Sequence, residues 1–251
     1  AKHLKVKTFG FPTDLVQSNP DASITHYEAT SWESCSLTIR INNKDYHVTL
    51  PNVGRHLALG AAAALLAADA AGVDLNLAAK ALSKVKLPPM RMEVVERDGI
   101  NWVLDMYNAA PASTIAALET VAEVAKGLKF AVLGEMRELG PASEEGHREV
   151  GAALARLGFL AAITLDAPGE ESTRTRAGRT VETLGGTPEP RGPTRWIIEA
   201  ALESGMSASN LTHASSFEEV RQWLSTRRAG DTILIKGSRG VELERVIPKW
   251  D

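Results

Sequence analysis

Apolar and polar side chains alternate in two short stretches near the start of the chain. SLTIRI and DYHVTL flank the turn Asn42-Asn43-Lys44, and this arrangement predicts a β-hairpin inside a β-rich region spanning residues 4–50. An Ala/Leu-rich run over 54–72, closed by a glycine, predicts a helix, and 75–85 predicts a shorter one. The two prolines of Leu87-Pro88-Pro89 cannot continue a helix, so the sequence predicts a domain boundary there.

Beyond these prolines the spacing of apolar residues changes. A second hairpin is expected around Asp98-Gly99, and apolar strands then alternate with helices, which predicts a mostly parallel sheet covered on both faces. Ser143 is the expected N-cap of one helix, and Ser216 to Glu219 resembles a capping box. The strands are expected in KFAVLGEM, FLAAITLD, NLTHAS and DTILIKGS, and the helices over 112–127, 143–158, 170–184, 193–205 and 216–230.

Composition narrows the class of protein. With 251 residues and 44% hydrophobic content, the chain is long enough for one large domain or two small ones. Its 28 basic and 31 acidic residues are well mixed, which gives no support for a nucleic-acid or membrane-surface partner. The lone Cys35 cannot form an internal disulfide, which fits a reducing cytoplasm. The longest apolar run, Ala61 to Ala68, is too short to span a bilayer.

The usual loops that hold phosphate groups are missing from the sequence. Neither G-x-x-x-x-G-K-[ST] nor a G-x-G-x-x-G after the first strand of the α/β region is present. The chain therefore lacks the common cradle for a triphosphate. It also opens with Ala and no signal peptide, directly before strand-like sequence, so we expect a fragment of a longer protein.

Polar groups follow two of the expected strands. Asp105 ends an apolar run and is followed by Tyr107 and Asn108, and ligands commonly bind at the carboxyl ends of strands in open α/β sheets. The last strand runs into Lys236 and Arg239, separated by small residues whose backbone N–H groups can hold an anion. The alternative is a strand-ending turn with solvated cations.

Three further features carry charge or a titratable ring. Glu135, Arg137 and Glu138 follow a third strand, and two carboxylates there suit an amine or a metal, although a plain charged loop fits as well. His56 lies in the first turn of an expected helix, where histidine commonly caps or packs. Arg91 follows the two prolines beside the expected domain boundary, and interdomain clefts often bind ligands, although most arginines are simply solvated.

The order of these motifs resembles the C-terminal half of a Mur ligase. The motifs are GRH before an Ala-rich helix, MRMEVVERDG, DMYNAAPAS, AVLGEMRELG followed by His147, and DTILIKGSRGVELERV. The resemblance covers nearly the whole chain. It implies an α/β fold in which residues 1–88 form the tail of a P-loop-type central ATPase domain. Residues 89–251 would form the Rossmann-like C-terminal domain.

The resemblance also implies an activity. Asp-x-Tyr-Asn-Ala-x-Pro-x-Ser, Gly-[Asp/Glu]-Met-x-Glu-Leu-Gly and Lys-Gly-Ser-Arg are similar to the motifs of members that act in peptidoglycan precursor synthesis. These members join D-alanyl-D-alanine to UDP-N-acetylmuramoyl-tripeptide through an acyl phosphate, using ATP and Mg²⁺. In phosphoryl transfer, much of the rate acceleration comes from binding the reactants in the correct orientation. The fragment would need the missing N-terminal domains of the same enzyme and would be inactive alone, and no catalytic residue or metal ligand is expected within it.

Five residues are implied on the nucleotide side of the site. Asp105 would hold the ATP ribose, and Tyr107 and Asn108 would line the nucleotide beside it. Arg91 would reach the phosphates, and His56 would lie near the base.

Five others are implied on the side of D-alanyl-D-alanine. Glu135 and Glu138 would lie near the incoming amine, and Lys236, Ser238 and Arg239 would lie near the carboxylate of the dipeptide.

The chain departs from the family motifs at four positions. Met90 stands where the family usually has glycine. Leu57, Gly60 and Ala110 stand where the family usually has asparagine. Each lost neutral hydrogen bond is worth about 0.5–1.5 kcal/mol, so we expect adenine recognition to be weakened or reshaped. Two alternatives stay open. One is a related ligase with another amino-acid substrate, such as a polyglutamate-type enzyme, although those relatives usually carry His in place of Asn108. The other is a binding module that has lost catalysis.

Overall fold

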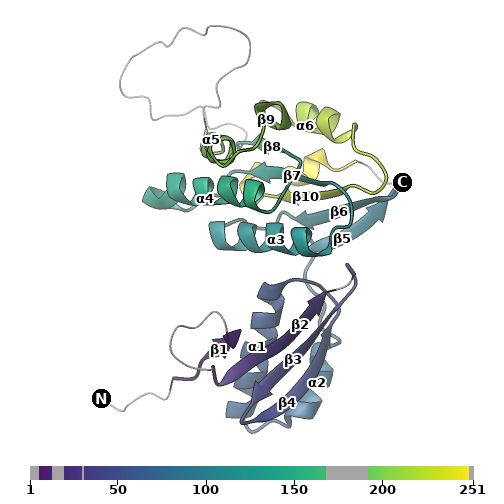
Figure 1. Cartoon of the computed structure of the whole chain (residues 1–251), viewed down its shortest axis with the longest axis vertical. Helices are drawn as coiled ribbons and strands as arrows, with labels where there is room; N and C mark the ends of the chain where they lie inside the picture. Colours follow the sequence, from purple (N-terminus) through teal and green to yellow (C-terminus); the bar gives the residue numbers. More distant parts are fainter. Residues whose placement is uncertain (1–5, 13–19, 30, 168–191, 249–251) are drawn as a thin grey trace, which may run out of the picture. The chain divides into compact units, whose positions relative to one another are not determined.

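The computed structural model describes residues 6–12, 20–29, 31–167 and 192–248. The chain folds into two compact units that divide between Pro88 and Pro89 (Figure 1). The helix expected over 170–184 lies outside the described residues. Within the described residues, the structure has no helix that combines the length and the apolar character needed to cross a membrane.

The first unit is a four-stranded sheet with two helices packed against it. The strands lie in the order β1-β2-β3-β4, with β1 parallel to β2 and the other pairs antiparallel. The predicted hairpin is confirmed, and Asn42 and Asn43 form its turn with φ of 50° and 61°. The elements are β1 (Phe9–Gly10), β2 (Ala22–Ala29), β3 (Cys35–Ile41), β4 (Lys44–Leu50), α1 (Arg55–Ala70) and α2 (Leu75–Leu82).

Alternation along β3 explains how this unit buries its core. Leu37 and Ile39 are buried, whereas Ser36 and Arg40, which flank them along the strand, are exposed. Successive side chains of a strand point to opposite faces, so one face of the sheet is apolar. Both α1 and α2 contact the sheet and each other, and the buried Leu65 of α1 belongs to the resulting core.

The second unit is a six-stranded α/β sheet, which confirms the predicted fold class. The strand order is β5-β6-β10-β7-β8-β9, and every neighbouring pair is parallel except β5 with β6. The β5–β6 hairpin turns at Asp98 and Gly99, with φ of 54° and 73°, as expected for this dipeptide. The strands are β5 (Glu93–Arg97), β6 (Ile100–Asp105), β7 (Lys129–Gly134), β8 (Ala161–Leu165), β9 (Leu211–Ala214) and β10 (Thr232–Lys236).

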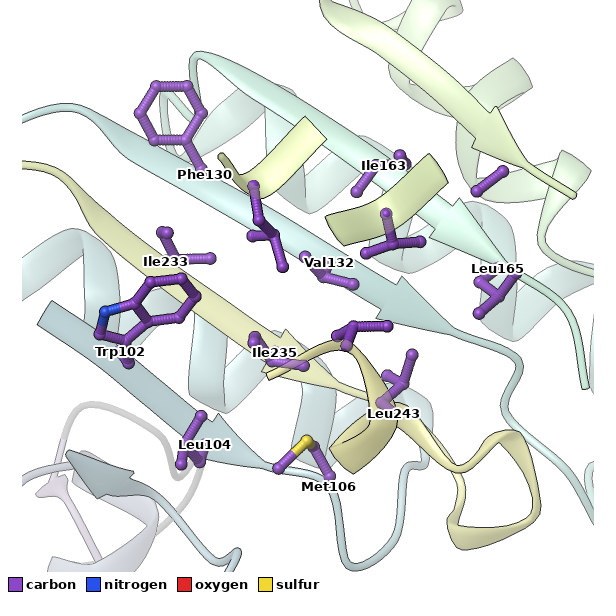
Figure 2. Close-up of a cluster of buried hydrophobic side chains, with 14 of the residues drawn as sticks. Trp102, Leu104, Met106, Phe130, Val132, Ile163, Leu165, Ile233, Ile235 and Leu243 are labelled. Carbon is purple, nitrogen blue, oxygen red and sulfur yellow. The ribbon is translucent and has the colours of Figure 1, made fainter. Parts of the chain in front are cut away.

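Helices cover both faces of this sheet. Figure 2 shows one face, where side chains such as Trp102, Val132 and Ile235 lie in one apolar cluster with Leu243 from the C-terminal segment. Residues that alternate with these, such as Val103, are also buried, on the opposite face of the strands. The helices are α3 (Pro111–Val124), α4 (Ser143–Arg156), α5 (Arg195–Glu203) and α6 (Phe217–Leu224), of which α6 contributes to the cluster in Figure 2.

Two local expectations differ from the structure. Ser143 is the first residue of α4 and not its N-cap, because a 3₁₀ turn over Gly140–Ala142 leads directly into the helix. The motif DTILIKGSRGVELERV also overlaps a stretch, VELERVI, whose sequence can form a helix; the structure instead has 3₁₀ turns over Arg239–Val241 and Leu243–Val246, separated at Glu242 by a left-handed φ of 58°. Ser216 does cap α6, since its hydroxyl accepts a hydrogen bond from the Glu219 N–H.

Candidate functional site

The carboxyl ends of β6, β10 and β7 lie side by side at one edge of the second unit. In the parallel register Lys236 is paired with Asp105 on one side and with Leu133 on the other. The loops that follow these strands therefore begin at neighbouring points. Nine of the ten residues that the sequence singles out belong to the second unit, and His56 is the exception. This edge is the one at which open α/β sheets bind ligands.

Asp105 is held by partners on both of its carboxylate oxygens. Its Oδ2 lies 2.6 Å from the Lys236 ammonium, and its Oδ1 accepts a hydrogen bond from the Met92 N–H at 3.3 Å. The side chains of Lys236 and Asp105 are 2% and 13% exposed. An ionised carboxylate offers about four lone-pair positions, so Asp105 retains capacity for further hydroxyl donors.

Lys236 also fixes the turn that follows β6. Its ammonium donates a second hydrogen bond, of 3.0 Å, to the backbone carbonyl of Asn108. The Asn108 side chain is exposed, and its Oδ1 accepts from the Ala109 N–H at 2.8 Å. Ala110 is the N-cap of the next helix, α3, and its N–H donates a hydrogen bond of 3.1 Å to the Ser113 hydroxyl in the first turn.

Tyr107 brings two cations together at the surface. The guanidinium carbon of Arg91 lies 4.2 Å from the centre of the tyrosine ring, and that of Arg239 lies 5.7 Å from it. All three side chains are exposed. The Tyr107 N–H donates to the carbonyl of Met90, which has a left-handed φ of 59° where the family usually has glycine. Two guanidinium groups beside one aromatic ring favour an anionic ligand nearby.

The loops after β7 and β10 are joined through their backbones. A Cβ added to Gly237 would lie 3.0 Å from the Cα of Gly134, so these loops approach more closely than side chains allow. The Ser238 N–H donates to the carbonyl of Glu135 at 3.1 Å, and the Arg137 N–H donates to the Ser238 hydroxyl at 2.8 Å. Ser238 is therefore buried, with its hydroxyl oxygen accepting a bond and its hydroxyl hydrogen able to donate.

The two predicted carboxylates of this loop differ in environment. Glu135 is 8% exposed, and its Oε2 lies 3.4 Å from the Ala167 N–H. Glu138 is exposed and has a left-handed φ of 68°. The sequence groups these residues as a pair, whereas the structure buries one and presents the other to solvent.

His147 of α4 is hydrogen-bonded to the backbone of the loop that follows β7. It is fully buried, its Nδ1 lies 2.6 Å from the Ser143 carbonyl, and its Nε2 accepts from the Met136 N–H at 3.0 Å. This pattern requires a neutral ring with the proton on Nδ1. Burial lowers the pKa of His147, against the opposing effects of the hydrogen bond to Ser143 and the charge of Asp166. The sequence indicated a histidine here only by resemblance.

A second polar cluster was not predicted from the sequence. The Nδ1 of His213 lies 3.1 Å from the Thr164 hydroxyl and 3.3 Å from the Thr194 hydroxyl, and its Nε2 lies 3.6 Å from Asp166. Burial lowers the pKa of His213, although Asp166 and Glu219 favour its charged form. These residues come from strand ends and loops far apart in sequence, so no local motif indicates them.

His56 belongs to the first unit. It is half-buried in the first turn of α1, next to Gly54, whose N–H donates to the Tyr27 hydroxyl at 3.1 Å. Leu57 is half-buried, and Gly60 is exposed with no atom within 4 Å of an added Cβ. The role of His56 near the base stays a prediction.

Side chains that ligate metals do not gather at one point among the described residues. Residues 6–12, 20–29, 31–167 and 192–248 contain no group of three or more His, Cys, Asp or Glu side chains that could hold a metal ion.

A parallel sheet with one antiparallel edge strand, and charged groups gathered at its carboxyl edge, defines a Rossmann-like α/β domain. Residues 90–239 match the family described as Mur ligase, glutamate ligase domain. The chain belongs to the Mur ligase family.

Individual relatives agree with this assignment. The chain is 30% identical over 230 residues to the UDP-N-acetylmuramoyl-tripeptide–D-alanyl-D-alanine ligase of Rickettsia prowazekii, covering 92% of the chain and 45% of the relative. It is 30% identical over 201 residues to the Bacillus subtilis enzyme of the same name, covering 79% and 38%. The chain thus spans less than half the length of these relatives.

A solved structure supports the fold. The MurF ligase of Thermotoga maritima, in complex with ADP, superimposes with a TM-score of 0.69 at 24% identity. The match covers 91% of this chain and 45% of the Thermotoga protein.

Proposed function

We propose that the chain is part of an ATP-dependent peptide ligase of bacterial, cytoplasmic peptidoglycan precursor synthesis. The enzyme joins D-alanyl-D-alanine to UDP-N-acetylmuramoyl-tripeptide. The observation that carries this proposal is the arrangement of Asp105, which is fixed at the carboxyl end of β6 beside the exposed Tyr107 and its two guanidinium groups. The names of the relatives support the same substrates.

The two units have different proposed roles. Residues 1–88 would be the C-terminal part of the central ATP-binding domain, with His56 near the base, and residues 89–251 would be the C-terminal domain. The remainder of the enzyme would supply the phosphate loop, which the sequence of this chain lacks.

The nucleotide would bind at the β6 end of the edge. Asp105 has lone pairs left for the ribose hydroxyl groups, and such charge-assisted bonds are strong. Asn108 and the Tyr107 ring would line the nucleotide, and Arg91 would lie close to the phosphates. A guanidinium group matches phosphate geometry in two parallel hydrogen bonds.

The proposed reaction has two steps. A carboxylate oxygen of the tripeptide attacks the γ-phosphorus of ATP, the bond to the β-phosphate oxygen breaks, and ADP leaves. The free amine of D-alanyl-D-alanine then attacks the acyl carbon, inorganic phosphate leaves, and the nitrogen loses a proton. Exclusion of water protects the acyl phosphate from hydrolysis.

Residues on the β7 and β10 loops would hold the dipeptide. Glu138, which is exposed, and the buried Glu135 would lie on the side of the amine. Arg239 and the Ser238 hydroxyl, whose hydrogen is able to donate, would lie on the side of the carboxylate. No step is assigned to a metal on this chain, and the complete enzyme would require Mg²⁺ with ATP.

Two other functions remain as candidates. A polyglutamate-type ligase of the same family is disfavoured by Asn108, where such relatives usually carry His. A binding module without catalysis is favoured by Leu57, Gly60 and Ala110, which replace family asparagines and remove their hydrogen bonds.

The test is an assay of the full-length protein from the source gene. With ATP, Mg²⁺, the tripeptide precursor and D-alanyl-D-alanine, we expect phosphate release that depends on both peptide substrates. L-alanyl-L-alanine and glutamate are the matched alternative acceptors. The 251-residue chain alone should release no phosphate above background. Activity with glutamate alone would favour the polyglutamate-type function, and nucleotide binding without turnover would favour the binding module.

A further inference from the structure

Lys236 is unusual among the cations of this chain. It is the only lysine or arginine in residues 6–12, 20–29, 31–167 and 192–248 that is buried, with 2% of its surface exposed. A buried cation is expensive unless charged or polar partners surround it. Its partners therefore indicate what the side chain is for.

Both hydrogen-bond partners of the ammonium belong to one motif. The Nζ donates to Asp105 Oδ2 at 2.6 Å and to the Asn108 carbonyl at 3.0 Å. The first partner ends β6, and the second lies in the turn that carries Tyr107. The Lys236 side chain from β10 therefore binds both ends of the segment from Asp105 to Asn108. Lys236 and Asp105 are 131 residues apart in the sequence.

The Asp105 carboxylate is held from two directions. Lys236 binds one oxygen from the neighbouring strand, and the Met92 N–H binds the other at 3.3 Å from the segment before β5. Two donors on opposite oxygens restrict rotation of the carboxylate plane. The remaining lone pairs consequently point in fixed directions, as a site that must receive hydroxyl groups requires.

We propose that Lys236 is a positioning residue for the nucleotide side of the site. It orients Asp105 and the Tyr107–Asn108 turn, and it does not itself hold the carboxylate of the incoming dipeptide. This inference rests on the proposed function. Two geometric facts support it: the Lys236 side chain is only 2% exposed, and two of the three ammonium donors already bind Asp105 and the Asn108 carbonyl.

The first experiment separates the two substrates. In the full-length enzyme, Lys236→Met should raise the apparent KM for ATP ten-fold or more and change the KM for D-alanyl-D-alanine by less than two-fold. Lys129→Met is the matched control, because Lys129 begins the adjacent strand β7 at the opposite end of the sheet. The control should leave both KM values unchanged. A residue with only a structural role would lower the melting temperature and leave both KM values of the folded enzyme unchanged.

The second experiment asks whether Lys236 acts through Asp105. In a double-mutant cycle, Lys236→Met should change the KM for ATP by less than three-fold when Asp105→Asn is already present. The double variant also removes both charges of the buried pair, so it should fold even if Lys236→Met alone does not. In that event, the comparison of the double variant with Asp105→Asn decides the question.

Three results would overturn the inference. They are an unchanged KM for ATP in folded Lys236→Met, a rise of ten-fold in the KM for the dipeptide, or an equal effect of Lys236→Met in both backgrounds of the cycle. Each of these would leave a working wild-type ligase, and so the proposed function, intact. A wild-type protein that neither binds nor uses ATP would instead overturn the proposed function and this inference together.

Discussion

The carboxyl edge of the second unit contains two groups of residues that differ in depth. The inner group, Asp105, Glu135, Lys236 and Ser238, is buried or nearly so, and each member contacts the backbone or a side chain of a neighbouring loop or strand. The outer group, Arg91, Tyr107, Glu138 and Arg239, is exposed. Arg91 and Arg239 of the outer group both lie near the Tyr107 ring. Among the described residues, neither arginine has an ion-pair partner.

This difference separates two tasks that a binding site must perform. Groups that are already hydrogen-bonded inside the protein fix the geometry, and groups that face solvent are available to a ligand. A substitution in the inner group should therefore lower stability and function together. A substitution in the outer group should affect ligand binding with little change in stability.

The largest expected effect is at Asp105. Asp105→Ala leaves the Lys236 ammonium buried without its carboxylate, and breaking such a pair costs about 3–5 kcal/mol. Urea denaturation of this chain should show that loss in the free energy of unfolding. Glu138→Gln, an exposed carboxylate of the outer group, should change it by less than about 0.5 kcal/mol. Equal losses in the two variants would remove the distinction between the groups.

The next effect concerns the close approach of two loops. A Cβ at position 237 would lie 2.8 Å from Leu243 Cδ1 and 3.0 Å from the Cα of Gly134. Gly237→Ala should therefore cost about 1–3 kcal/mol through overpacking. Gly60→Ala is the control, because Gly60 lies in the middle of α1 and an added Cβ there would have no atom within 4 Å. This change should stabilise the chain by up to about 1 kcal/mol. A neutral Gly237→Ala would show that the loops can separate.

A smaller effect is expected from pH. The folded-state pKa of His147 is lowered by burial, so the neutral ring contributes stability that is fully present above the ordinary pKa of about 6.5. That contribution is lost as the pH falls from there through the lowered pKa, because the unfolded chain binds the proton first. His147→Gln should flatten the fall in unfolding free energy between about pH 7.5 and 5, by at most about 1.36 kcal/mol per pH unit.

His213, whose pKa is also lowered by burial, should retain part of the slope in that variant. The double variant with His213→Gln should flatten it further. An identical slope in wild type and His147→Gln would show that the pKa of His147 is the same in the folded and unfolded states.

Much of the fold was predictable from local sequence. Alternation around Asn42-Asn43 and Asp98-Gly99 predicted both hairpins, and the sequence of apolar strands and helices predicted the parallel sheet. These signals are local, because strand pleating and turn conformation depend on residues close together in sequence. The prediction of Ser143 as an N-cap was wrong, because a 3₁₀ turn over Gly140–Ala142 precedes α4 and no local pattern indicated that turn.

The site was predictable only in part. Resemblance grouped Asp105 with the nucleotide side and Lys236 with the dipeptide side, whereas the structure pairs their side chains. That pairing follows from β10 lying between β6 and β7, and strand order is set by the packing of the whole sheet. The same holds for His213 and Asp166, which no motif connects.

A small effect on stability is expected in the outer group, at Arg91. An exposed cation over an aromatic ring contributes about 0.5–1 kcal/mol, so Arg91→Met should lower the free energy of unfolding by no more than that. Arg245→Met is a matched control, because Arg245 is also exposed and lies 4.2 Å from the centre of the Phe217 ring. In the full-length enzyme, only Arg91→Met should raise the KM for ATP, because only Arg91 is proposed to meet the phosphates. If both variants lose similar stability and neither changes that KM, the outer group is a solvated surface and its proposed role in binding is lost.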